Sequence, residues 1–282
     1  MENSNQNVWF VTGASKGLGL SLVKRLLNEG YKVVATSRSL GDLENAVGNH
    51  TNFLPLVVDI LNEQSVAEAV NKTVGKFGSL DVVVNNAGYG LVGAIEELTD
   101  AESRQNFDVN VFGSLNVIRQ ALPQLRKQRS GHIFNIASIG GFTGNFPGFG
   151  IYRATKFAVH GFTESLAAEV AEFGIRATVV SPGYFRTNFL EGSSLAVPKN
   201  AIEDYKSVRD VQGAHENEIN NNQPGDPDKG ADVIIKTAAL AQPPLHLFLG
   251  PDAYNLAEVK IKDVQKDLEA VREIATSTNF EN

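Results

Sequence analysis

The stretch Val8-Trp-Phe-Val-Thr-Gly-Ala-Ser-Lys-Gly-Leu-Gly-Leu20 decides the fold. It begins as a short apolar strand, passes through Gly13, Gly17 and Gly19, and continues as a helix with its leucines on one face. Glycines at this spacing let a backbone approach a pyrophosphate at the helix N-terminus, where unpaired N–H groups attract anions. A glycine triplet alone also fits a tight turn, but the flanking strand and helix favour a dinucleotide-binding unit.

Short apolar runs repeat this strand-and-helix alternation along the chain. Continuous apolar runs separated by segments of helical length are typical of parallel strands that are buried on both faces. The sequence therefore predicts one α/β domain over residues 1–282, a doubly wound Rossmann-type fold with a seven-stranded parallel sheet. The expected strands are Val8–Val11, Lys32–Thr36, Phe53–Val58, Asp81–Val84, His132–Ala137, Ala177–Ser181 and His246–Leu249.

Of the six tyrosines, only Tyr152 is followed four residues later by a lysine, Lys156. On a helix this spacing places both side chains on one face. A fixed cation beside a phenol favours the phenolate and lowers its pKa from about 10 towards neutrality, which suits an acid catalyst. Taken alone the pair fits a solvated helix contact better, so its meaning depends on the rest of the chain.

Five motifs follow one another along the chain. They are Thr12-Gly-Ala-Ser-Lys-Gly-Leu-Gly19, Asn85-Asn-Ala-Gly88, Ser138, Tyr152-x-x-x-Lys156 and Pro182-Gly183. Their order resembles the short-chain dehydrogenases/reductases of the non-extended branch, and the similarity covers about residues 8–190. This resemblance implies an oxidoreductase that transfers hydride between a nicotinamide and a CH–OH or C=O group, here an NADPH-dependent carbonyl reductase or ketoreductase.

The resemblance assigns the catalytic roles within residues 138–156. Hydride transfer to a carbonyl carbon needs a proton donor and a partner for the oxygen. Tyr152 would donate the proton, Ser138 would hold the carbonyl oxygen, and Lys156 would lower the pKa of Tyr152 and bind the nicotinamide ribose. Asn110 matches the asparagine that connects this lysine through water to solvent, although a buried asparagine that bonds only locally is the alternative.

The end of the second strand predicts which dinucleotide binds. An NAD enzyme normally places a carboxylate there for the ribose 2′-hydroxyl, whereas this chain has Ser37 followed by Arg38. The Arg38 guanidinium can stack on adenine and contact a 2′-phosphate, and Lys16 can approach the same group. NADPH/NADP+ is therefore the expected cofactor, the alternative being that both cations are ordinary solvated charges.

The resemblance implies further cofactor contacts. Asp59 would accept a hydrogen bond from the adenine amino group while the Ile60 N–H contacts the ring, although Asp59 also fits a turn former or helix cap. Thr187 would contact the nicotinamide carboxamide or the diphosphate. The other cofactor residues act mainly by positioning; besides the three loop glycines they are Ser15, Leu18, Asn86, Ala87, Gly88, Pro182 and Gly183.

Aromatic residues near the motifs suggest an apolar substrate pocket that takes a lipophilic ketone, aldehyde or secondary alcohol. The alternative is that about half of them belong to the core. Between Ser138 and Tyr152 lie 13 residues, one more than expected for the family, and a polar segment at about residues 189–227 is expected to form a mobile lid. The candidate pocket residues are Phe142, Phe146, Phe149, Tyr184, Phe185, Phe189 and Leu190.

Composition narrows the function classes. A net charge of −7 argues against a nucleic-acid surface, and the absence of cysteine excludes disulfides and thiolate sites. The five histidines show no ligand spacing, so no metal is expected. Without a long apolar run, and with a polar start that does not resemble a signal peptide, the protein is expected to be soluble and cytoplasmic, with no membrane contact and a small-molecule partner.

Relatives of this type imply a homo-oligomer, a dimer or tetramer that pairs through helices at about residues 101–128 and 152–173. Leu115, Val117, Ile118 and Leu122 fit that interface or the core equally well. The stretch Asp252 to Ser277 predicts a charged amphipathic helix that caps the pocket or covers an oligomer face. Alternatives to a reductase are a dehydrogenase working in the alcohol-oxidising direction, a noncatalytic NADPH-sensing regulator and a structural Rossmann subunit.

Overall fold

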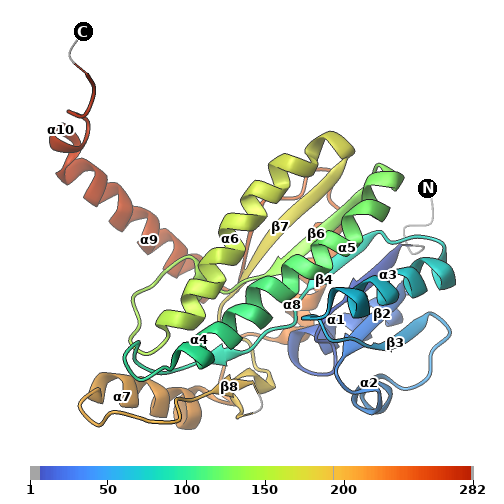
Figure 1. The fold of residues 1–282 in the computed structure, drawn as a ribbon, viewed down its shortest axis with the longest axis horizontal. Coiled ribbons are helices and arrows are strands. Elements are labelled where there is room, and N and C mark those ends of the chain that lie inside the picture. The colour runs from blue at the N-terminus through green and yellow to red at the C-terminus, as the bar shows by residue number, and fades with distance from the viewer. Residues whose placement is uncertain (1–6, 193, 281–282) are drawn as a thin grey trace.

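The computed structural model describes residues 7–192 and 194–280 and contains a seven-stranded sheet in the order β3-β2-β1-β4-β6-β7-β9 (Figure 1). Every strand pair in this sheet is parallel, which confirms the predicted fold class. The order reverses between β1 and β4, and ligands of such sheets bind at this place, beyond the carboxyl ends of the strands. The strands are β1 (Val8–Val11), β2 (Lys32–Ser37), β3 (Phe53–Val57), β4 (Val82–Asn85), β6 (Gly131–Ile136), β7 (Ile175–Pro182) and β9 (His246–Leu249).

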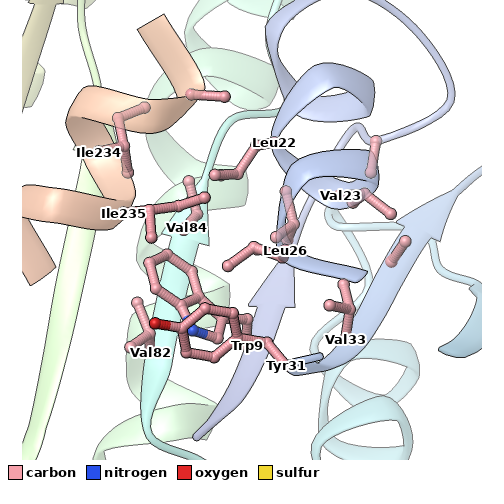
Figure 2. Close-up of a cluster of buried hydrophobic side chains, with 14 of the residues drawn as sticks. Trp9, Leu22, Val23, Leu26, Tyr31, Val33, Val82, Val84, Ile234 and Ile235 are labelled. Atoms are coloured by element: carbon pink, nitrogen blue, oxygen red, sulfur yellow. The ribbon is translucent and has the colours of Figure 1, made fainter. Parts of the chain in front are cut away.

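Helices cover both faces of this sheet. On one face lie α1 (Gly17–Asn28), α2 (Leu40–Val47) and α8 (Pro227–Ala238), and on the other α3 (Glu63–Phe77), α5 (Gly113–Gln128) and α6 (Gly150–Val170). Successive strand residues alternate between the faces. Trp9 packs under α1 and α8 (Figure 2), whereas Phe10 belongs to the cluster under α3 and α5. The apolar side chains of β1 therefore contribute alternately to two separate hydrophobic cores, one on each face of the sheet.

The helix expected over about residues 101–128 contains a change of winding. It runs as α4 (Asp100–Phe107), a π-helical segment η2 (Asp108–Phe112) and α5. Val117 and Ile118 are buried in the core under α5, and Leu115 and Leu122 pack against the same cluster. These four residues therefore serve the core of the subunit.

The predicted lid segment is not irregular. It contains the short helix η5 (Asn188–Leu190), the strand β8 (Leu195–Ala196), α7 (Lys206–Ala214) and the π-helical segment η6 (His215–Ile219), and β8 pairs with β5 (Gly90–Leu91). Figure 1 shows α7 and β8 close to α4 at one end of the molecule, where the Lys199 N–H donates to Glu102 of α4. The polar start, residues 1–6, and Ser193 of the predicted lid lie outside the described residues.

Two short helical turns flank α6, η3 (Ile139–Gly141) before it and η4 (Ala171–Phe173) after it. The last long helix, α9 (Pro251–Ala270), leaves the body of the molecule and is followed by α10 (Arg272–Ala275) (Figure 1). Within the described part of the chain, none of the helices combines the length and apolarity needed to cross a membrane.

Candidate active site

The glycine-rich loop between β1 and α1 packs directly against the turn that follows β4. Gly13 and Gly17 have φ values of +62° and +59°, which favour glycine. A Cβ atom at Gly13 would lie 2.7 Å from the Cα of Ala87, and one at Gly19 would overlap Nδ2 of Asn86. Only bare backbone fits here, as the approach to a pyrophosphate requires.

Thr12 fixes these two segments to one another. Its Oγ1 accepts hydrogen bonds from the N–H groups of Asn86 (3.0 Å) and Ala87 (3.1 Å). In return, Nδ2 of Asn86 donates to the carbonyl oxygens of Thr12 and Gly13, both at 3.0 Å. A Cβ at Gly17 would lie 3.5 Å from Cβ of Thr187, so Thr187 borders the same loop. The carboxyl ends of β1, β4 and β7 thus meet at the N-terminus of α1, where a dinucleotide diphosphate fits.

The neighbouring strand ends contain the residues expected at the adenosine end of the cofactor. Arg38 follows the last residue of β2 and is exposed, and Oγ of Ser37 accepts from the N–H of Ser39 at 3.3 Å. Oδ1 of Asp59 accepts from the N–H of Leu61 at 3.0 Å. Asp59 therefore forms the turn that was its alternative role, and its carboxylate remains exposed beyond β3.

The predicted catalytic residues come together from β6 and α6. Tyr152 and Lys156 lie one turn apart on α6, and only 8% and 5% of their respective surfaces are exposed. The side chain of Ser138 is close enough to Tyr152 to lower the pKa of its hydroxyl, and Oγ of Ser138 accepts a hydrogen bond from the N–H of Gly140 at 3.0 Å. Nζ of Lys156 donates to the carbonyl oxygen of Ile136 at 2.9 Å and lies 5.8 Å from the centroid of the Tyr152 ring. The structure brings all three together, with Tyr152 and Lys156 buried and Ser138 half-buried.

Burial sets the protonation of this pair. It raises the pKa of Tyr152 to about 12, against the smaller opposing effects of the Ser138 side chain and the Arg153 charge. It also lowers the pKa of Lys156 to about 8. The direction for Tyr152 is opposite to the one expected from Lys156 alone because loss of hydration outweighs the nearby cations. At neutral pH Tyr152 keeps its proton and Lys156 is mainly charged.

Asn110 occupies the π-helical segment η2, a form of helix often found at functional sites. Its Nδ2 donates to the Tyr89 carbonyl and to Oγ1 of Thr155, and its Oδ1 accepts from the Tyr89 N–H, all at 3.0 Å. A Cβ at Gly88 would lie 2.9 Å from Oδ1 of Asn110 and 3.5 Å from Nζ of Lys156. The side chain of Asn110 therefore bonds to nearby residues, which agrees with the purely structural role considered above. It also lies next to Gly88, as Lys156 does.

Part of the predicted aromatic pocket lies beside Tyr152. The Phe189 ring centroid lies 5.9 Å from that of Tyr152, and Leu190 is buried in the same cluster. Phe149, also in this cluster, meets Tyr152 edge-on at 6.2 Å. The Tyr184 hydroxyl lies 3.0 Å from Nε2 of His215 in η6.

The other predicted pocket residues pack elsewhere. Phe185 packs against the core of Figure 2, where a Cβ at Gly230 would lie 2.8 Å from its ring. Phe142 meets Phe248 edge-on at 5.2 Å beneath α9. Phe146 lies under the Arg153 guanidinium, 4.4 Å from ring centroid to Cζ. Phe142 and Phe185 are half-buried and pack against the clusters beneath α9 and α8, and their place in the substrate pocket stays a prediction.

Sequence reasoning missed two residues that shape the site. His215 is buried against Phe149, 5.0 Å between ring centroids, but it lies in a polar segment with no motif. Asp252 accepts from the Tyr184 N–H at 2.7 Å through Oδ2, and a Cβ at Gly183 would overlap that oxygen. The available signal for Asp252 was an acidic residue in the first turn of a helix after Gly-Pro.

The fold also gathers a group of possible metal ligands that the sequence spacing did not suggest. Ligand atoms of His160, Glu164 and His246 lie within 4.8 Å of one another among the described residues. Nε2 of His160 is 2.9 Å from Oγ of Ser181, and burial lowers the pKa of His160 to about 4. This group lies further along α6 than Tyr152 and Lys156.

Comparisons with known proteins agree with this geometry. The sequence profile of the short chain dehydrogenase family matches residues 7–196. Oxidoreductase BOA17 of Botryotinia fuckeliana is 37% identical over 274 residues, which is 96% of this chain and 98% of that protein. Retinol dehydrogenase 8 of Bos taurus is 37% identical over 248 residues, 83% of this chain and 78% of that protein.

Solved structures are similar over nearly the whole chain. A short-chain dehydrogenase from Streptomyces avermitilis has a TM-score of 0.88 and 34% identity and covers 97% of this chain and 99% of its own. ElxO with NADP bound (TM-score 0.70, 29% identity) covers 86% of this chain and 96% of its own. The same coverages hold for 3-ketoacyl-(acyl-carrier-protein) reductase from Brucella melitensis complexed with NADH (TM-score 0.72, 25% identity).

The match to this family covers two thirds of the chain. The same part of the chain contains the glycine-rich loop and the group of Ser138, Tyr152 and Lys156. Structural neighbours bind nicotinamide cofactors, with NADP in one and NADH in another. This chain belongs to the short-chain dehydrogenase family and is an oxidoreductase acting on CH–OH or C=O groups.

Proposed function

We propose that the protein is an NADPH-dependent carbonyl reductase that converts a lipophilic ketone or aldehyde to an alcohol. The observation that carries this proposal is the burial of Tyr152 beside Ser138 and Lys156. Burial raises the pKa of Tyr152 to about 12, so the phenol keeps its proton at neutral pH. A protonated phenol is the form needed to donate a proton to a carbonyl oxygen. The bound nicotinamide would supply the hydride.

The residues of this chain have separate tasks in that reaction. Ser138 holds the carbonyl oxygen and orients it towards the hydroxyl of Tyr152, which gives up its proton as negative charge develops on that oxygen. Lys156, mainly charged at pH 7, offers N–H donors to the ribose and stabilises the phenolate left on Tyr152. Asn110 and Lys156 both lie beside Gly88. In this proposal Asn110 positions the path by which solvent returns a proton to Tyr152 through Lys156.

The preference for NADPH rests on the adenosine end of the site. Ser37 ends β2 where an NAD enzyme normally has a carboxylate, and Arg38 and Lys16 are exposed at the neighbouring strand and loop. A guanidinium and an ammonium suit a 2′-phosphate. Related structures contain either form of the cofactor, so the choice depends on these side chains.

The proposed substrate class follows from the cluster around Tyr152. Phe149, Phe189 and Leu190 belong to the apolar cluster that contains Tyr152. A similar protein is named retinol dehydrogenase 8, after a lipophilic alcohol. Oxidation of an alcohol would need a Tyr152 phenolate, which a pKa of about 12 disfavours before the cofactor binds. We therefore favour reduction.

A homo-oligomeric state and a cytoplasmic location complete the proposal, and both rest on the resemblance to relatives. Because Val117 and Ile118 are buried in the core, a dimer contact through α5 would use the exposed face of that helix. Binding of NADPH without turnover of any ketone would instead support the noncatalytic NADPH-sensing alternative, and the experiment below measures both binding and turnover.

The test is the initial rate of NADPH and NADH oxidation with a panel of aromatic and aliphatic ketones, with Tyr152→Phe as control. We expect turnover with NADPH in the native protein and a loss of about 10²–10⁴-fold in the variant, because the phenol proton is missing. Cofactor titration by fluorescence should give similar affinity for both proteins. Native protein that binds NADPH but reduces none of the ketones would contradict the proposal.

A further inference from the structure

The C-terminal helix α9 starts against the body of the molecule and then leaves it. Ala253 and Ala257 are buried next to Ile139, the residue after Ser138. Beyond them, every residue from 261 to 280 is exposed, and Figure 1 shows this part of the helix pointing away from the sheet. A short solvated stretch of helix is marginally stable by itself, and most helical stability in proteins comes from packing of an apolar face.

The apolar residues of this helix follow a heptad repeat. They are separated alternately by three and four residues, the spacing of the a and d positions of a coiled coil. Between residues 258 and 272 only Val259 and Ala270 are apolar and lie outside this seam. The seam consists of Tyr254, Ala257, Ile261, Val264, Leu268 and Val271.

The exposure of the seam shows where a partner is needed. Ala257 is buried against the body, whereas Ile261, Val264, Leu268 and Val271 are 46%, 40%, 62% and 49% exposed. One stripe thus packs on its own subunit at its base and continues uncovered for two further heptads. A narrow a/d stripe fits a single partner helix, whereas a helix lying on a globular surface has a wider apolar face.

We propose that this seam pairs with the same helix of a second copy of the chain. The flanking charges are self-complementary. In a parallel pair, Asp267 at a g position lies beside Arg272 at an e position of the second copy. In an antiparallel pair centred between Ile261 and Val264, Asp267 lies beside Lys260 of the second copy. Neither arrangement brings like charges together at these flanking positions, which favours self-association over an unrelated partner.

This contact is separate from any pairing through helices α5 and α6. The seam is short, so the pairing it gives is expected to depend on concentration or to join subunits that also meet elsewhere. In both cases removal of the seam takes away one step of assembly. The mass of the particle in solution is therefore the direct readout.

The first test compares masses by light scattering during size-exclusion chromatography at several micromolar concentrations. The seam variant Val264→Glu/Leu268→Glu should have half the mass of the native chain. The matched control Asn255→Glu/Ala270→Glu adds the same charge at positions outside the seam and should keep the native mass. Equal masses for the native chain and the seam variant, or a loss of mass in the control, would overturn the proposal.

A second test uses the absence of cysteine in the chain. Val264→Cys faces itself in a parallel pair, and Ile261→Cys/Val264→Cys provides facing thiols in an antiparallel one. Under mild oxidation of dilute protein we expect a disulfide-linked dimer from one of these variants. Lys262→Cys, which points away from the seam, serves as the control. If neither seam variant links more efficiently than this control, the helices do not pair.

The body must remain folded for both tests to be valid. The substituted residues are exposed and lie outside the two cores. The seam variants and the control variants should therefore unfold at about the same temperature as the native chain. A seam variant that unfolds at the native temperature but has half the mass supports helix pairing. This outcome does not depend on whether the enzyme reduces ketones.

Discussion

The proposed cofactor side and the proposed substrate side of this site are built by different means. On the cofactor side, glycine backbones and the side chains of Thr12 and Asn86 join two strand ends, with close approaches that no Cβ can enter. On the substrate side, aromatic side chains from α6, η5 and η6 meet around Tyr152. Backbone constraints leave a signature in the sequence, whereas a pocket made of side-chain contacts leaves much less.

The largest expected effect tests the adenosine end of the cofactor side. Ser37→Asp/Arg38→Ala removes a cation and restores the carboxylate that binds a ribose 2′-hydroxyl. If two charge-assisted contacts of about 1.5–3 kcal/mol each hold the 2′-phosphate, the ratio of NADPH to NADH affinity should fall by about two to four orders of magnitude. Dissociation constants for both cofactors measure it. An unchanged ratio would remove these residues from cofactor selection.

The next prediction tests whether backbone approach is what the loop requires. Gly13→Ala places a methyl group 2.7 Å from Cα of Ala87 at a positive φ, which should cost about 2–4 kcal/mol in strain and overpacking. Gly75→Ala, in the interior of α3 with no atom near its added Cβ, should stabilise by about 0.5–1 kcal/mol. Chemical denaturation gives both values. Effects of the same sign would contradict the distinction.

A smaller effect is expected where the lid segment meets the body. Nη2 of Arg209 on α7 lies 2.7 Å from Oε2 of Glu97, whose side chain is fully buried. Because Arg209 is 28% exposed, its replacement by alanine should cost about 2 kcal/mol, less than for a fully buried pair. Arg104→Ala, at a solvent-exposed pair with Asp100, should leave stability close to that of the native chain. Urea unfolding of the two variants compares them.

The Arg209 prediction has a functional counterpart. If the ion pair with Glu97 holds α7 over the pocket, Arg209→Ala should raise the KM for a ketone more than the KM for NADPH. Equal stability of the Arg209 and Arg104 variants would show that the buried carboxylate of Glu97 is compensated by its other partners, the N–H groups of Ala94 and Ile202.

The smallest effect separates the two kinds of aromatic residue on the substrate side. Phe189→Leu, next to Tyr152, should change the KM for a bulky ketone by about fivefold, equivalent to about 1 kcal/mol, without a change in unfolding temperature. Phe185→Leu should lower the unfolding temperature and leave the ranking of ketones unchanged, because Phe185 packs against the core beneath α8. A reversed pattern would exchange their roles.

Much of the fold could be predicted because apolar runs and glycines mark buried parallel strands and their ligand loop. All seven expected strands occur within two residues of their predicted ends. The group of Ser138, Tyr152 and Lys156 was also predictable, because helical spacing and the strand end bring these residues together. The positions of Phe142 and Phe185 were not, since an aromatic residue next to a motif packs equally well against a helix on either side.

Long-range polar contacts were the other part that sequence could not supply. His215 reaches Tyr184, and Glu97 reaches Arg209, across 31 and 112 residues. The raised pKa of Tyr152 likewise depends on how completely the lid segment and α6 bury it, and spacing along one helix contains no information on burial. Such features appear only when the segments are assembled in three dimensions.

The contact between Asp252 and the turn after β7 has a practical consequence for protein engineering. Asp252 fixes the backbone at Gly183 and Tyr184 from the first turn of α9, so the active site needs the base of this helix. A shortened chain should therefore keep Ala257 and its contact with Ile139, and fusion partners are better attached beyond residue 258 than before it. A chain cut before Asp252 would lose the carboxylate that holds the backbone after β7, and one cut between Asp252 and Ala257 would lose the packing that holds the helix in place.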